Sequence, residues 1–162
     1  MVTPMWVRIA RKYEGLREIK GAPTDPIIAG WLKRLGAWWR DDETPWCGTF
    51  VAAVVSEAGM KPPAAWYRAK AWLSWGKKLD GPSLGAIVVF ERTGGGHVGI
   101  VVGIDDKGNL MVLGGNQGDA VRVSPFARSR VLGYRWPEFY PTPALSTLPV
   151  LASTGELSRN EA

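Results

Sequence analysis

The chain contains a single cysteine, Cys47, in a sequence context that predicts the start of a helix. Thr44 is a residue type that caps helix N-termini, and Pro45 suits a first helical position. An apolar, helix-compatible run follows at residues 50–55. We therefore expect Cys47 in the first turn of a buried helix, where free backbone N–H groups and the helix dipole favour the nucleophilic thiolate. The alternative is a buried, inert cysteine, which is the usual state of a free one.

A nucleophilic cysteine requires a base, and the chain has a single histidine, His97. A run of three glycines precedes it, and residues 97–104 have the pattern of a strand. Because side chains alternate along a strand, His97 would share a face with Gly99 and Gly103, which carry no side-chain bulk. Such a face either lets a helix start approach the imidazole or leaves room for a substrate. A tolerated histidine at the start of a strand is the alternative.

An orienting group for the base is expected after the next strand. Asn116 stands there, and its amide oxygen could accept the imidazole N–H and fix the tautomer of His97. Asn116 is equally typical of a turn, and Gln117 is the neighbouring alternative, which we also place among the substrate-binding candidates.

Two further candidates for substrate binding lie close to the cysteine in sequence. Trp46 precedes it directly and is the best candidate for a wall of the cleft. Asp42 belongs to an acidic group before the predicted helix, where it provides either favourable charge at a helix N-terminus or a substrate-facing carboxylate. A carboxylate beside the sulfur would oppose thiolate formation, so we expect this group to point away from it.

The overall composition suits one domain with a sizeable core in 162 residues. The formal net charge is +5, and residues 137–162 contribute −2, which leaves +7 for residues 1–136. Such a domain is attracted to polyanions, among them a cell wall, a membrane surface and nucleic acid. The basic residues are scattered, so charge alone favours no nucleic-acid motif. One His and one Cys also disfavour a zinc site.

Two absences in the sequence bear on localisation. No stretch approaches the roughly 20 apolar residues that span a bilayer, so we expect no stable membrane insertion. The N-terminus has no apolar h-region, and we therefore expect synthesis in the cytoplasm without a signal peptide.

The first half of the chain has helical periodicity, whereas the second half has short apolar runs between turn residues. The pattern predicts four helices, at residues 4–13, 25–35, 44–58 and 62–76. It predicts five strands in an antiparallel meander, at residues 86–90, 97–104, 110–113, 120–124 and 131–136. Helices followed by strands predict an α+β fold, with N-terminal helices packed on a five- to six-stranded antiparallel sheet.

The segment 137–162 has a different composition, with four prolines followed by Ser, Thr and Glu. We expect the domain to occupy residues 1–136 and the remainder to be a Pro-rich tail, either extended along the surface or disordered.

The order of these residues resembles that of the papain-like NlpC and CHAP cysteine hydrolases. Four blocks carry the resemblance, at residues 45–51, 85–90, 96–99 and 114–117. They resemble the successive blocks of a peptidoglycan-hydrolase subgroup that is common in bacteriophages and prophages. The resemblance covers about residues 5–136, and the Trp-Cys and Gly-Gly-Asn-Gln blocks together are its most specific part.

The resemblance implies a papain-like fold and hydrolysis of an amide bond in peptidoglycan, either within the stem peptide or between muramic acid and L-alanine. It implies Cys47 as the nucleophile, His97 as the general base and acid, and Asn116 as the orienting third member, without a metal or cofactor. Relatives of the NlpC type have a tyrosine near the oxyanion site, and its equivalent stays open between Tyr13 and Tyr67.

The leading hypothesis is therefore an endolysin-like, monomeric hydrolase that acts on the cell wall after release by a pore or a secretion machine. One alternative is a non-catalytic wall-binding or phage structural module on the same fold. The other is nucleic-acid binding driven by charge, which the missing basic cluster disfavours.

Overall fold

The computed structural model describes residues 3–19, 25–39, 45–144, 148–153 and 157–158. The helices are α1 (Met5–Arg11), α2 (Pro26–Leu35) and α3 (Cys47–Glu57), with two short 3-10 helices, η1 (Ala69–Ser74) and η2 (Arg128–Arg130). The strands are β1 (Lys77–Leu79), β2 (Ile87–Arg92), β3 (Gly95–Ile104), β4 (Leu110–Gly114), β5 (Arg122–Phe126) and β6 (Val131–Trp136). The described residues thus form helices and a six-stranded antiparallel sheet, which confirms the α+β fold.

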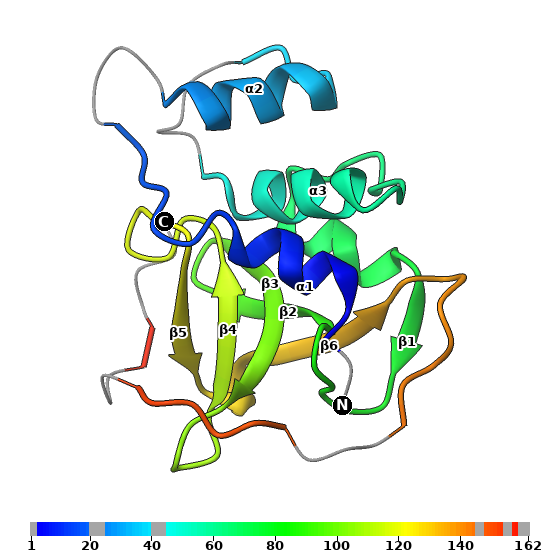
Figure 1. Cartoon of the computed structure of the whole chain (residues 1–162), viewed down its shortest axis with the longest axis vertical. Coiled ribbons are helices and arrows are strands. Elements are labelled where there is room, and N and C mark those ends of the chain that lie inside the picture. Colours follow the sequence, from blue (N-terminus) through cyan, green and yellow to red (C-terminus); the bar gives the residue numbers. More distant parts are fainter. Residues whose placement is uncertain (1–2, 20–24, 40–44, 145–147, 154–156, 159–162) are drawn as a thin grey trace.

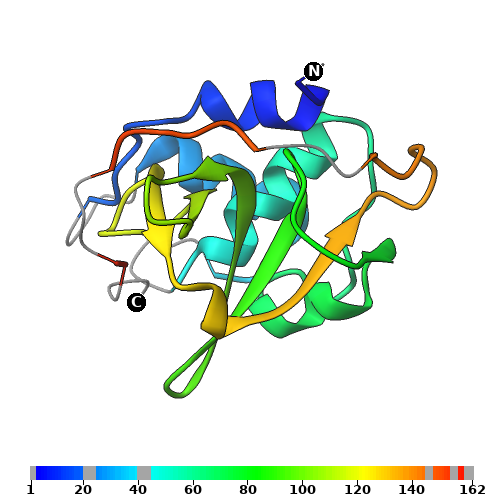
Figure 2. The same cartoon turned by 90° about the horizontal axis from the view of Figure 1, so that it is seen from below.

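The strand order within this sheet is β1-β6-β2-β3-β4-β5. Strands β2 to β5 form the predicted meander, but β6 returns across the sheet and inserts between β1 and β2. Figures 1 and 2 show β6 in orange beside β2. The prediction that all five strands follow one another as a simple meander was therefore wrong. The missing strand, β1, has only three residues, too few for an alternating pattern to show in the sequence.

Helix α3 is the central helix of the molecule. It packs against β3 and β4 of the sheet and contacts both other helices, with α2 on its side away from the sheet (Figure 1). Every side chain from Cys47 to Val55 is buried, which is the condition of a helix that is apolar on all faces. None of the helices among the described residues is long and apolar enough to cross a bilayer.

Helix α2 confirms the second predicted helix, because all of its boundary signals are local. Oδ1 of Asp25 accepts hydrogen bonds from the backbone N–H groups of Ile27 at 2.9 Å and Ile28 at 3.1 Å. Pro26 occupies the first helical position, and Gly36 ends the helix in the left-handed region at φ 82°.

The prediction of a fourth helix at residues 62–76 was wrong, because only the short η1 forms there. Its tryptophans are buried as expected, but two of their indole N–H groups bond to backbone carbonyls of the same segment. Trp72 donates to the carbonyl of Trp66 at 3.1 Å, and Trp75 donates to that of Lys61 at 2.8 Å. These bonds hold a compact irregular segment instead of a continuous α-helix.

Strand β5 begins two residues later than predicted, because the residues before it pair elsewhere. Ala120 forms a bridge with Arg17, and the backbone N–H of Val121 donates to the carbonyl of Leu16 at 2.8 Å. The N-terminal segment after α1 thereby lies against the turn that follows β4.

The described part of the tail lies along the domain in extended form. The backbone N–H of Ile104, at the end of β3, donates to the carbonyl of Pro149 at 2.9 Å, and that of Leu151 donates back to Ile104 at 2.7 Å. Leu148 is buried in the hydrophobic core. Figure 1 shows this segment in red, passing below β3 and β4.

Candidate active site

Cys47 is the first residue of α3 and is almost completely buried. This confirms its expected place in the first turn of a buried helix. The cap was predicted two residues too early, since Trp46 is the N-cap residue and the backbone N–H of Phe50 donates to its carbonyl at 2.9 Å. Thr44 lies outside the described residues, as do Asp42 and the rest of the acidic group.

His97 is the third residue of β3, just after the tight hairpin that joins β2 to β3. It pairs across the hairpin with Phe90 of β2, whereas the pairing of β3 with β4 begins only at Ile100. His97 therefore lies on the part of β3 that extends beyond β4. Its ring is fully buried and stacks on Phe126, with 5.3 Å between ring centroids and 8° between the planes.

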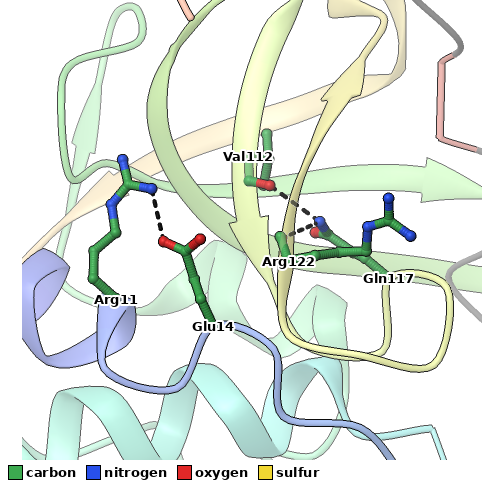
Figure 3. A network of polar contacts seen from close by, with 5 residues as sticks. All are labelled: Arg11, Glu14, Val112, Gln117 and Arg122. Atoms are coloured by element: carbon green, nitrogen blue, oxygen red, sulfur yellow. Dashed lines mark hydrogen bonds and ion pairs between the residues drawn. The ribbon is translucent and has the colours of Figure 1, made fainter. Parts of the chain in front are cut away.

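Gln117 binds the imidazole directly. Its Oε1 lies 2.9 Å from Nε2 of His97. Its amide nitrogen donates to the carbonyl of Val112 at 3.0 Å and to that of Arg122 at 2.8 Å, two bonds that Figure 3 shows between the ends of β4 and β5. All polar atoms of the buried Gln117 side chain are thus engaged.

These contacts determine the tautomer of His97. Both carbonyls that Gln117 contacts can only accept, so its NH₂ group must face them and its oxygen must face the ring. An amide oxygen also can only accept, so Nε2 of His97 must carry a proton. The neutral ring therefore keeps Nδ1 as its basic nitrogen.

Two glycines provide the space for this contact. A Cβ atom at Gly114 would collide with the Gln117 amide and would lie 3.3 Å from Nε2 of His97. A Cβ atom at Gly99 would lie 3.6 Å from Oε1 of Gln117 and would collide with Val112. The room beside His97 is thus taken by Gln117 and its neighbours rather than by a substrate.

The thiol of Cys47 is electrostatically coupled to His97. Burial raises the pKa of Cys47, but the charge of His97 and hydrogen bonds with the His97 side chain and the Val98 backbone outweigh this effect. The positive charge of Arg92 acts in the same direction. The pKa of Cys47 is therefore lowered, which favours the thiolate.

The ring nitrogen that remains for this interaction is Nδ1 of His97. It is buried, and among the described residues it has no fully formed hydrogen bond. His97 thus acts on the thiol of Cys47 although no hydrogen bond between them meets the full geometric requirements, as is common in active sites without substrate. A cysteine at a helix start, a histidine and a side-chain amide form a connected series, which is the arrangement of a thiol hydrolase.

Residues 39–116 match the family model of the CHAP domain. Over this span the chain is similar to a CHAP domain. CHAP domains are typically cysteine peptidases or amidases, and the match indicates a hydrolase or amidase that acts on peptidoglycan. The comparison with curated protein sequences gives no match.

The CHAP match ends at Asn116, which we predicted as the orienting residue, but the contact with His97 is made by Gln117. Asn116 is buried in the turn after β4 with a left-handed backbone, at φ 59°. Since this conformation reverses the chain direction, the side chain that reaches the imidazole belongs to the following residue. Gln117 is consequently enclosed and is not available to bind a substrate.

Trp46, which lies within the CHAP match, is not a wall of the cleft. Its side chain is 1% exposed, and Nε1 donates to Glu18 at 3.3 Å. The ring fills the space above Gly115, where a Cβ atom would lie 2.9 Å from two of its carbons. Trp46 therefore packs beneath the site rather than facing a substrate.

A cleft of about 440 Å³ opens beside Cys47. The described residues that line it include three cationic side chains and no carboxylate: Pro45, Cys47, Tyr67, Arg68, Ala69, Lys70, Arg92, Gly94, Gly95 and Gly96. Of the two tyrosines left open by the sequence, Tyr67 lies at this cleft. Tyr13 lies at the other end of α3, where its hydroxyl donates to Glu57 at 2.6 Å. Sequence reasoning left Tyr67 unassigned and did not identify Arg68 or Lys70, because an irregular segment has no periodicity from which a shared face could be inferred.

Proposed function

We propose that this CHAP-like domain is an endolysin-like thiol hydrolase that cleaves an amide bond of peptidoglycan, either in the stem peptide or between muramic acid and L-alanine. The observation that carries the proposal is the series Cys47, His97 and Gln117, in which a fixed imidazole lies beside a thiol of lowered pKa.

The chemistry follows from the roles of these groups. The Cys47 thiolate attacks the carbonyl carbon, and backbone N–H groups at the start of α3 stabilise the oxyanion. The C–N bond then breaks, and the leaving amine takes its proton from Nδ1 of the His97 imidazolium. His97 next removes a proton from water, which attacks the thioester. The C–S bond breaks, and a carboxylic acid and the free Cys47 are released.

The lining of the cleft supports a substrate of this class. Arg68, Lys70 and Arg92 line this cleft, and none of its described lining residues is acidic; Lys70 also forms an ion pair with Glu91, at 3.1 Å. Such a surface is complementary to a polymer that carries carboxylates. The positive net charge of the chain favours association with an anionic wall. A phage origin, release through a pore or secretion machine and a monomeric state stay predictions.

The decisive experiment is the solubilisation of purified sacculi, followed by mass spectrometry of the released fragments. Wild type should release muropeptides with a new amine and a new carboxylate, which identify the bond cut. Cys47→Ala should reduce the rate by many orders of magnitude without loss of fold, checked by circular dichroism. Undiminished activity of Cys47→Ala would exclude the mechanism. Binding of wild type to sacculi without any product would support the non-catalytic alternative.

A further inference from the structure

Four aromatic side chains form a continuous row beside the cleft, which we call the aromatic shelf: Trp38, Trp39, Trp66 and Tyr67. The ring centroids of Trp38 and Trp39 are 5.4 Å apart, and those of Trp39 and Tyr67 are 5.5 Å apart. Trp66 lies behind them, 5.9 Å from Trp39 and 5.5 Å from Tyr67. The shelf begins at Tyr67, which lines the cleft of Cys47, and ends at Trp38 on the surface.

The shelf is fixed to the same turn of α3 that carries the nucleophile. Gly48, the residue after Cys47, lies against the backbone of Trp66 and Tyr67, so closely that a Cβ atom there would collide with the Trp66 carbonyl. Trp66 is buried, and its carbonyl accepts the indole N–H of Trp72 at 3.1 Å. The row therefore has a defined position relative to the sulfur of Cys47.

The outer end of the shelf exposes an unusual amount of apolar surface. Trp38 is 89% exposed, and Tyr67 is 44% exposed. An indole exposed to water lacks the favourable free energy that burial of a large aromatic ring provides. Adjoining exposed apolar groups commonly mark a binding surface. The rings meet at steep angles, 77° between Trp38 and Trp39 and 85° between Trp39 and Tyr67, so they present a stepped surface rather than one flat patch.

We propose that the aromatic shelf binds the glycan strand of peptidoglycan. A pyranose ring has an apolar C–H face that packs on an aromatic ring, while its hydroxyl groups remain in water. Successive rings at 5.4 Å and 5.5 Å suit a chain of such faces. The stem peptide is covalently joined to the glycan strand, so a peptide in the cleft brings sugar rings to the adjoining surface. The inference rests on the proposed function for this choice of polymer.

The test measures saccharide binding separately from hydrolysis. A soluble β-1,4-linked N-acetylglucosamine hexasaccharide, which carries no peptide, is titrated into the full chain by calorimetry. Trp38→Ala should weaken binding roughly tenfold, and Trp38→Phe, which retains an aromatic face, should recover most of it. Phe139→Ala is the matched control. Phe139 is equally exposed, at 96%, but lies with Gly59 and Met60 at the opposite end of α3.

A second measurement connects binding with the cleft. The rate of sacculus solubilisation below saturation should fall in Trp38→Ala by about the same factor as saccharide affinity, while alkylation of Cys47 by iodoacetamide should keep its wild-type rate. A hexasaccharide that does not bind, or that binds wild type and Trp38→Ala equally, would overturn the inference. The inference would also be overturned if Trp38→Ala lost binding to anionic phosphatidylglycerol vesicles but kept the wild-type affinity for the saccharide. The shelf would then bind a membrane. Saccharide binding without any hydrolysis would refute the proposed function alone.

Discussion

At the scale of single residues, the orientation of the His97 ring depends on the side-chain amide of Gln117, which cannot flip. Gln117 faces two carbonyls with its nitrogen, so its oxygen has no alternative but to face Nε2. In the proposed mechanism, Nδ1 is thereby the ring nitrogen that is left to exchange a proton with Cys47. In this respect Gln117 has the role that an asparagine or carboxylate has in other triads, where it sets a tautomer without taking the proton.

The two neighbouring amides can be separated by mutation. Gln117→Ala should lower the turnover of sacculi on the order of 10²- to 10⁴-fold, because the ring loses its fixed tautomer. It should also lower the melting temperature, since the carbonyls of Val112 and Arg122 lose their donor. Asn116→Gly is the matched control, because glycine tolerates the positive φ at that position. A greater loss of activity in Asn116→Gly than in Gln117→Ala would return the orienting role to Asn116.

The lowered pKa of Cys47 predicts how its reactivity depends on pH. Only the thiolate is alkylated, so the rate of reaction with iodoacetamide should rise through a midpoint below that of an ordinary cysteine. In His97→Gln the charge and hydrogen bond of the imidazole are lost while burial remains, so the midpoint should move upward. The measurement is the alkylation rate between about pH 5 and 10, a range that spans the usual His and Cys values. Identical midpoints in the two proteins would contradict the coupling.

At the scale of elements, the start of α3 is held in place by a close backbone contact. Gly48→Ala would drive its Cβ atom into the carbonyl of Trp66, and the neighbours are backbone atoms that cannot rotate away. We expect a loss of about 1–3 kcal/mol in the free energy of unfolding, together with reduced activity, because the contact lies beside Cys47.

Gly30→Ala provides the matched control for this substitution. Gly30 lies within α2, and a Cβ atom there would meet only Arg34, at 3.8 Å. Alanine should therefore stabilise this helix by about 0.5–1 kcal/mol, the usual difference in helix propensity. Denaturant unfolding of both variants gives the comparison. Equal stability of Gly48→Ala and wild type would show that the contact between α3 and the irregular segment can relax at no cost.

The sequence predicts those elements whose signals are local. Helix α2 has an Asp cap, a proline at its first position and a C-terminal glycine, and each of these acts on the adjacent backbone. The segment 62–76 has equally suitable residues for a helix, but its structure is decided by indole groups that bond to backbone carbonyls several residues away. Propensity does not contain that information, so tertiary contacts override it there.

The same distinction applies to the site. Cys47 and His97 could be predicted as candidates because each is the only residue of its type in the sequence and because glycines and helix signals surround them. The choice between Asn116 and Gln117 could not be made from spacing, because it depends on the backbone conformation of the turn after β4. The aromatic shelf has no signal in the sequence, since residues 38–39 and 66–67 come together only in the folded chain, where Trp39 contacts Trp66 and Tyr67.

At the scale of the whole molecule, the tail contributes to the stability of the domain. Leu148 is buried in the core, and Pro149 and Leu151 bond to the end of β3. Leu148→Ala should therefore lower the free energy of unfolding by about 2–3 kcal/mol. Val150→Ala is the control from the same segment, because Val150 is 65% exposed and its truncation should change stability by less than about 0.5 kcal/mol. Coincident unfolding curves for the two variants would mean that the tail is not part of the cooperative unit.

The three groups of the site come from three distant parts of the chain. Cys47 begins a helix, His97 lies 50 residues later on a hairpin, and Gln117 lies 20 residues beyond it in the turn between two strands. Contacts of this sequence separation form late, because the loops between them must close first. A nascent or partly folded chain therefore carries only an ordinary thiol, and the reactive sulfur appears when the long-range sheet is complete. Folding itself is the activation step, and alkylation of Cys47 during refolding would report the moment at which the last of these contacts forms.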